Sequence, residues 1–254
     1  MLKRLVRRVI NKIGYDVIRR RTLPFADYLP FDFDEATVDT YEKVKAYTMT
    51  SPERIASLCN AVNYLVKNNI KGDIVECGVW KGGSSMAAID TLIKAGDTTR
   101  AIYLYDTFEG MSEPTGHDRA FTGVPAEELL KSSKKEDSTS VWCYSALEEV
   151  QSNVSEFKYP SAQVHYIKGK VEDSIPQTIP GKIALLRLDT DWYESTAHEL
   201  KYLYPLLVPG GVIIIDDYGH WDGARKAVDE YIETQKLQLL LNRIDYTGRI
   251  GIKY

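Results

Sequence analysis

Two pairs of aspartates, Asp189 with Asp191 and Asp216 with Asp217, each follow directly on an apolar run. Such runs are typical of buried parallel strands, whose carboxyl ends meet at one edge of a sheet. Carboxylates crowded at that edge repel one another unless they are protonated or bridged by a cation. Oxygen ligands of this kind suit Mg²⁺. We therefore expect Asp189, Asp216 and Asp217 to bind a divalent cation.

A cation at this edge would bind an acceptor hydroxyl and lower its pKa, so a neighbouring base could remove the proton. Asp191, two residues beyond Asp189, is the predicted general base. His198 and His220 are weaker candidates for that role. The alternative for a lone aspartate after a strand is a helix cap, and it applies to Asp191 ahead of the helix expected at 193–206.

A glycine-rich turn follows the first expected strand. Gly78, Gly82 and Gly83 let the backbone approach a ligand, and the helix N-terminus behind them favours a carboxylate or phosphate. Their spacing is not G-x-G-x-x-G, which argues against a dinucleotide. Glu76 suits an ammonium group, and Asp106, at the end of the next strand, suits the two hydroxyls of a ribose. S-adenosylmethionine (SAM) carries all these groups; the alternative is a turn that binds nothing.

These residues require a scaffold, and the pattern after residue 72 predicts one. Apolar runs alternate with helical stretches, as in a doubly wound, mostly parallel α/β sheet of seven strands with helices on both faces. Strands are expected at 73–77, 101–106, 164–167, 183–188 and 211–215, with an antiparallel pair at 237–241 and 249–253; helices are expected at 40–48, 52–68, 84–95, 193–206 and 223–235. Residues 25–40 read as irregular.

The sequence divides into an arm at 1–21, a helical extension at 22–70 and a main domain at 71–254. A polar stretch with glycines and prolines at 108–138 is long enough to be a lid. The arm holds eight basic residues, one acid and apolar residues at helical spacing. Such a helix either lies on anionic lipid or packs against its own domain or a second subunit, so a homo-oligomer is expected if the arm reaches a neighbour.

Composition excludes several classes of protein. The 254 residues are 44% hydrophobic with a net charge of −4, which lends no support to nucleic-acid binding. No run approaches the ~20 apolar residues of a membrane span. Cys59, Cys77 and Cys143 lack metal-type spacing, which argues against a disulfide scaffold and suits a reducing cytoplasm.

Four motifs together resemble the macrocin-type sugar O-methyltransferases. They are Val75-Glu76-Cys77-Gly78-Val79-Trp80-Lys81-Gly82-Gly83-Ser84, Tyr105-Asp106-Thr107-Phe108-Glu109-Gly110-Met111, Arg187-Leu188-Asp189-Thr190-Asp191-Trp192-Tyr193-Glu194-Ser195-Thr196, and Pro209-Gly210-Gly211 followed by Asp216-Asp217-Tyr218-Gly219. The resemblance implies a class I SAM-dependent methyltransferase fold and magnesium. It places the metal ligands at Asp189, Asp216 and Asp217, the general base at Asp191, and the SAM contacts at Glu76, Gly78, Gly82, Gly83, Ser84, Ser85, Asp106, Glu172, Asp173, Thr50 and Ser51.

The expected function is Mg²⁺-dependent methyl transfer from SAM to a hydroxyl of a sugar or glycosylated small molecule. One alternative is a phenolic acceptor, and another is a module that binds SAM or a glycan without catalysis. The basic arm at 1–21 is not part of the pattern of the antibiotic-tailoring members, which leaves room for a membrane-proximal acceptor. The lid at 108–138 is where the choice of acceptor is expected to be made.

Overall fold

The computed structural model describes residues 29–135, 137 and 140–254, and the fold below is that of the compact unit Asp34–Tyr254. The arm predicted at 1–21 lies outside the described residues. Among the described helices, none is both long and apolar enough to cross a membrane.

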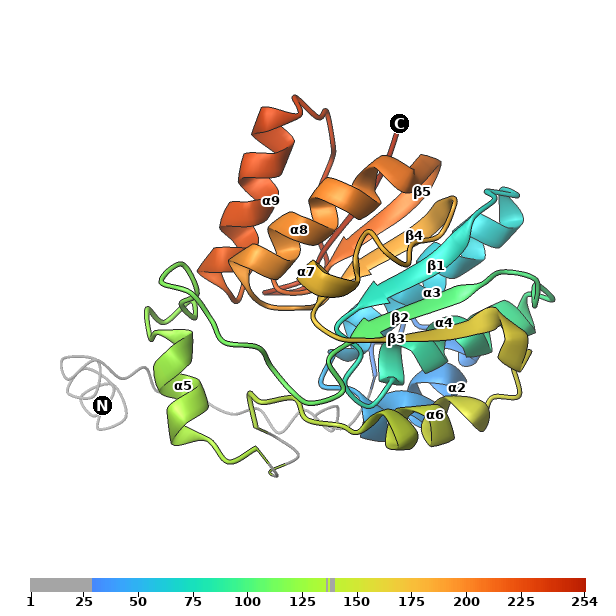
Figure 1. The fold of residues 1–254 in the computed structure, drawn as a ribbon. Helices are drawn as coiled ribbons and strands as arrows, with labels where there is room; N and C mark the ends of the chain where they lie inside the picture. Colours follow the sequence, from blue (N-terminus) through green and yellow to red (C-terminus); the bar gives the residue numbers. More distant parts are fainter. Residues whose placement is uncertain (1–28, 136, 138–139) are drawn as a thin grey trace, which may run out of the picture. The chain divides into compact units, whose positions relative to one another are not determined.

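Seven strands among the described residues form one sheet in the order β3-β2-β1-β4-β5-β7-β6 (Figure 1). They are β1 (Asp73–Cys77), β2 (Ile102–Asp106), β3 (Val164–Lys168), β4 (Ile183–Leu188), β5 (Leu207–Ile215), β6 (Asn242–Arg243) and β7 (Arg249–Ile252). The first five are parallel, and β7 is antiparallel to both of its neighbours. The register pairs Cys77 with Leu188 and Leu188 with Ile215, so β1, β4 and β5 end in line. The acidic segments after β4 and β5 therefore emerge side by side, as predicted.

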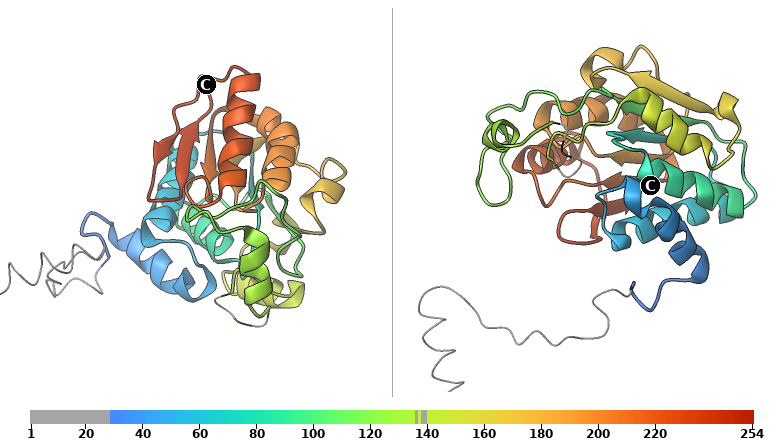
Figure 2. Two further views of the ribbon diagram at one scale, coloured as in Figure 1. Left: turned by 90° about the vertical axis from the view of Figure 1, so that its left-hand side faces the viewer. Right: turned by 90° about the horizontal axis from the view of Figure 1, so that it is seen from below.

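Helices cover both faces of the sheet (Figures 1 and 2). The α-helices of the described residues are α2 (Glu35–Val44), α3 (Pro52–Lys67), α4 (Gly83–Lys94), α5 (Ala126–Ser132), α6 (Leu147–Ser155), α7 (Val171–Ser174), α8 (Tyr193–Leu203) and α9 (Asp222–Thr234). Of these, α5 lies away from the sheet (Figure 1). Successive strand residues point to opposite faces: Ile74 joins the apolar cluster of α3 and α4, and Val75 joins that of α8 and α9. The predicted doubly wound α/β architecture is confirmed.

The start of the helical extension differs from the prediction. The helix expected at 40–48 begins earlier, at Glu35, inside the stretch at 25–40 that was expected to be irregular. Asp34 explains the difference, because its Oδ1 accepts a hydrogen bond of 2.7 Å from the backbone N–H of Thr37 and caps the helix. The polar, aromatic composition of this stretch conceals that cap.

The strand expected at 237–241 is wrong. The strand that pairs with β7 on this side is the short β6, which begins immediately after residue 241. Leu237, Leu239 and Leu241 alternate with other residues as in a strand. They lie in a segment without strand pairing and pack on the α8–α9 side of the sheet. Burial of an alternating apolar run is therefore no proof of strand pairing here.

Candidate active site

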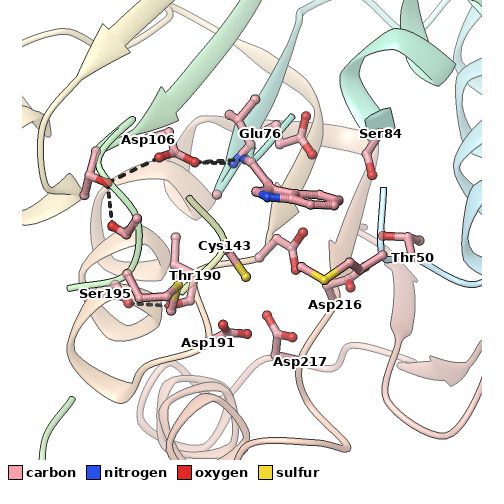
Figure 3. Close-up of a pocket in the computed structure, with 18 of the residues that line it drawn as sticks. Thr50, Glu76, Ser84, Asp106, Cys143, Thr190, Asp191, Ser195, Asp216 and Asp217 are labelled. Atoms are coloured by element: carbon pink, nitrogen blue, oxygen red, sulfur yellow. Dashed lines mark hydrogen bonds between the residues drawn. The ribbon is translucent and has the colours of Figure 1, made fainter. Parts of the chain in front are cut away.

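A cavity of about 320 Å³ lies beyond the carboxyl ends of β1, β2, β4 and β5. Figure 3 shows Glu76 and Asp106 toward one end and Asp191 and Asp217 at the other. Of the predicted site residues, Thr50, Glu76, Gly78, Gly83, Ser84, Asp106, Glu172, Asp189, Asp191, Asp216 and Asp217 line it. Ser51, Gly82, Ser85 and Asp173 do not.

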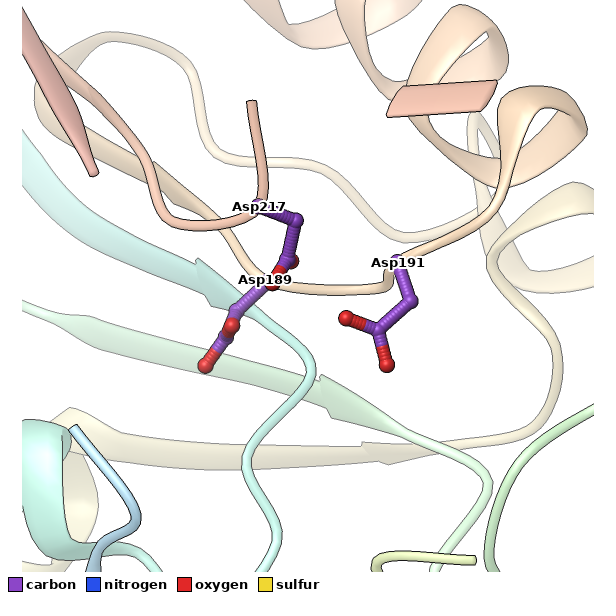
Figure 4. A group of neighbouring side chains, drawn as sticks. All are labelled: Asp189, Asp191 and Asp217. Atoms are coloured by element: carbon purple, nitrogen blue, oxygen red, sulfur yellow. The ribbon is translucent and has the colours of Figure 1, made fainter. Parts of the chain in front are cut away.

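Three carboxylates meet at the acidic end of the cavity. Asp189, Asp191 and Asp217 each offer an oxygen, and these oxygens lie within 4.8 Å of one another (Figure 4). Burial and neighbouring acids raise the pKa of Asp191 to about 7 and the pKa values of Asp189 and Asp217 well above the usual range. Carboxylates that resist ionisation beside one another are stabilised by a shared cation, so the cluster fits a hard divalent ion.

Asp216 is held differently from the other predicted ligands. Its Oδ1 accepts a hydrogen bond of 2.7 Å from Arg187, and its Oδ2 accepts one from Arg54. The cluster that the structure gathers thus contains Asp191 where the sequence predicted Asp216. Arg54 comes from α3 and also lies 3.0 Å from a carboxylate oxygen of Asp245, so the extension is ion-paired to the edge of the site.

Arg187 is ion-paired to three acids of the candidate site, and sequence reasoning missed it. Its guanidinium, 3% exposed, donates to Glu76 at 2.7 Å, Asp189 at 2.6 Å and Asp216 at 2.7 Å. Burial opposes its charge, but the surrounding acids outweigh burial and raise its pKa further. An arginine inside an apolar strand was the available signal, because a buried charge requires partners.

The turn after β1 is built around two acids. Asp106 accepts backbone hydrogen bonds from Val79 at 2.7 Å and Trp80 at 3.0 Å on Oδ2 and from Phe108 at 2.7 Å on Oδ1. Glu76 accepts from Arg187 and from Ser85, which places Ser85 behind the cavity wall. Both carboxylates predicted to bind SAM therefore have structural partners as well: Asp106 holds backbone N–H groups, and Glu76 holds two side chains.

Two glycines permit close approaches that the site requires. Gly78 has φ +82°, and a Cβ there would lie 1.9 Å from the carbonyl oxygen of Asp189. A Cβ at Gly83 would lie 2.5 Å from the carbonyl oxygen of Tyr47, where the extension meets the first residue of α4. Neither position accepts a side chain without displacing backbone.

The remaining predicted residues have separate places. Thr50 lies 3.2 Å from the guanidinium of Arg187, whereas Ser51 caps α3 through the N–H of Arg54. His198 lies on α8 with its Nε2 2.9 Å from the carbonyl oxygen of Ile175, outside the cavity lining. His220 is in the lining, and burial lowers its pKa, which favours the neutral ring.

Three rings from three loops pack together beside the acidic end. Phe121, His220 and Tyr246 lie with ring centroids 5.3 to 6.0 Å apart. Phe121 is 61% exposed and Tyr246 is 54% exposed, although both are large and apolar in part. Exposed rings beside a polar cavity are suited to contact the flat face of a ligand.

Comparison with known proteins shows the family of this chain. The family described as Macrocin-O-methyltransferase (TylF) matches residues 6–250. The chain belongs to this family. It is 34% identical to an 8-demethyl-8-(2,3-dimethoxy-α-L-rhamnosyl)-tetracenomycin-C 4'-O-methyltransferase of Streptomyces olivaceus, over 80% of this chain and 74% of that protein. It is 32% identical to a mycinamicin III 3''-O-methyltransferase of Micromonospora griseorubida, over 80% of this chain and 77% of that protein.

Solved structures agree with the family assignment. The O-methyltransferase NovP superposes with a TM-score of 0.70 at 29% identity, covering 82% of each chain. The calicheamicin methyltransferase CalS11 superposes with a TM-score of 0.58 at 15% identity, a likeness of fold. This macrocin O-methyltransferase family member is therefore a SAM-dependent O-methyltransferase with the class I fold, and both expectations from the sequence are confirmed.

Proposed function

We propose that this enzyme methylates a hydroxyl of a sugar or glycosylated small molecule and that it requires Mg²⁺. The observation that carries the proposal is one cavity that joins the glycine-rich turn and Asp106 to the cluster of Asp189, Asp191 and Asp217. The relatives named above, whose own names specify sugar positions, support a glycosidic acceptor.

In this proposal the cofactor lies at the turn after β1. Oδ2 of Asp106 already accepts two backbone N–H groups, so the ribose would bind through Oδ1, which accepts one backbone N–H and a long contact of 3.4 Å from the Thr107 hydroxyl. Glu172 of α7 lines the same cavity and would lie near the adenine. Glu76 lines the cavity and would accept a further hydrogen bond from the ammonium group of the amino acid moiety, beside those from Arg187 and Ser85.

The acidic end of the cavity binds the cation and the acceptor. SAM supplies the methyl group, and Mg²⁺ held by Asp189 and Asp217 would lower the pKa of the acceptor hydroxyl. Asp191, whose carboxylate lies beside those of Asp189 and Asp217, takes the proton of the acceptor hydroxyl. The ring of Tyr246, which lines the cavity, contacts the apolar face of the acceptor, and Phe121 packs beside it. Much of the rate enhancement then comes from positioning and electrostatics.

S-adenosylhomocysteine (SAH) should bind at one site when it is titrated calorimetrically into the protein with Mg²⁺ present. The Asp106→Asn variant should bind it at least about tenfold more weakly, because the amide keeps one acceptor oxygen and loses the negative charge. Absence of saturable binding by the wild-type chain would contradict the assigned cofactor site. A subsequent acceptor screen by product mass spectrometry distinguishes a glycoside from a phenol.

The third metal ligand is assigned to Asp216, which would exchange one arginine contact for the cation. Removal of its charge in Asp216→Asn should then lower Mn²⁺ affinity, measured by electron paramagnetic resonance, about tenfold or more. Asp191→Asn should leave that affinity within about threefold and abolish turnover. The reverse order would instead assign the cation to Asp189, Asp191 and Asp217, the set that lies closest together.

A further inference from the structure

Asp118 is a buried acid in the segment between β2 and α5, and the residue is only 1% exposed. Its Oδ1 accepts a hydrogen bond of 2.8 Å from the backbone N–H of Tyr193, the first residue of α8. Its Oδ2 accepts from the N–H of Thr115 at 2.6 Å and from the hydroxyl of Thr115 at 2.9 Å. The carboxylate therefore links two segments that are 75 residues apart.

The contact with Tyr193 completes a helix that cannot cap itself. Trp192 occupies the N-cap position of α8, and its side chain makes no capping hydrogen bond. Tryptophan has no acceptor atom for that purpose, so the exposed N–H groups of the first turn need a partner from elsewhere. Asp118 provides it, and its negative charge is also favoured at the N-terminus of a helix.

The capped position lies two residues after Asp191, whose backbone has φ +66°. This left-handed conformation costs energy for a non-glycine residue, less for aspartate than for most, so nearby hydrogen bonds help to hold Asp191 in it. The N–H of Trp192 donates to the carbonyl oxygen of Thr190 at 2.7 Å, across Asp191. Asp118 holds the backbone just beyond this bend by accepting from the N–H of Tyr193.

The same segment also contacts the loop after β5. The N–H of Phe121 donates to the carbonyl oxygen of His220 at 2.7 Å, and the N–H of Asp222 donates to that of Arg119 at 2.9 Å. A Cβ at Gly223 would lie 1.9 Å from Oδ1 of Asp118, so the first turn of α9 leaves room only for that carboxylate. One segment therefore contacts the starts of both helices that follow the acidic loops.

We propose that Asp118 is a positioning residue that caps α8 from outside and thereby fixes the strained backbone of Asp191. The proposal rests on the function proposed above, in which Asp191 is the base. It extends that function by assigning a task to the predicted lid: the segment that packs Phe121 against His220 and Tyr246 also sets the geometry of the acid cluster.

The test compares Asp118→Ala, Asp118→Asn and a matched control, Asp34→Ala. Asp34 is the N-cap residue of α2 and accepts from the N–H of Thr37, so its variant reports the general cost of losing a helix cap. The readouts are amide hydrogen exchange in 189–196, Mn²⁺ affinity, SAH affinity, and methyl transfer to methyl α-L-rhamnopyranoside. Thr115→Val, which removes one of the hydrogen bonds to Asp118, is a milder variant in case Asp118→Ala does not fold.

For Asp118→Ala we expect faster exchange in 189–196, weaker Mn²⁺ binding and a turnover lower by about 100-fold, with SAH affinity within about threefold. Asp118→Asn should restore only part of each value, because its amide oxygen can accept from Tyr193 while its NH₂ group then faces the N–H of Thr115. Thr115→Val keeps both backbone hydrogen bonds and should have the smallest effect of the three. Exchange in 189–196 that is unchanged, or changed equally by Asp34→Ala, would overturn the proposal. Wild-type protein that binds neither SAH nor Mn²⁺ would overturn the proposed function instead, while the exchange data would still decide the role of Asp118.

Discussion

Asp189→Asn is expected to lower Mg²⁺-dependent methyl transfer by about 10³-fold or more while SAH affinity stays within about threefold. Asp189 shares the acidic end of the cavity with Asp191 and Asp217. The substitution removes a full negative charge from the proposed cation site at nearly constant volume. The glycine-rich turn and Asp106 lie toward the other end of the cavity and keep their backbone hydrogen bonds (Figure 3).

The measurement is single-turnover methyl transfer over a range of Mg²⁺ concentrations, paired with SAH titration. Asp39→Asn is a suitable control, since Asp39 is a half-exposed acid on α2 that pairs with lysines outside the cavity. Turnover by Asp189→Asn within about tenfold of wild type would remove this residue from the cation site. A parallel loss of SAH affinity would instead indicate that the whole cavity had collapsed.

Arg187→Met should destabilise the folded protein by about 3–5 kcal/mol, because it leaves buried carboxylates without a counter-charge. The largest cost would come from Glu76 and Asp216, since the side chains of both are at most 4% exposed. The free energy of unfolding in urea measures the effect. Lys131→Met removes a cation from an exposed ion pair with Glu127 and should cost less than about 1 kcal/mol.

The pH dependence gives a second check on Arg187. Burial already raises the pKa of Glu76, and loss of the arginine should raise it further. A carboxyl group with a higher pKa in the folded state than in the unfolded state binds more protons when folded. Such a carboxyl group therefore makes the free energy of unfolding fall as the pH rises. Arg187→Met should thus regain stability between about pH 7 and pH 5, and a loss that is independent of pH would argue against uncompensated acids.

The sheet and the strand ends were predictable because their signals are local. Continuous apolar runs mark buried parallel strands, and register then brings Asp189 and Asp217 to one edge. The glycine-rich turn could be recognised for the same reason. By contrast, Asp34 was missed as a cap because one polar residue among many carries no distinctive pattern.

The partners of the acids were not predictable from sequence. Arg187 and Glu76 are 111 residues apart, and Arg54 and Asp216 are 162 apart, so nothing in either neighbourhood indicates the pairing. Asp118 reads as one more polar residue of a loop. Sequence reasoning placed the chemical groups at the site but could not assign the hydrogen bonds that orient them.

The ion pairs of Arg54 have a consequence for evolution and engineering. Because α3 contributes a guanidinium to Asp216 and Asp245, a chain that began at residue 71 would retain the acids of the proposed site but lose the arginine that balances Asp216 and Asp245. The helical extension is therefore not a separable module. Chimaeras between relatives that exchange residues 22–70 should remain active only if positions 216 and 245 are inherited together with position 54.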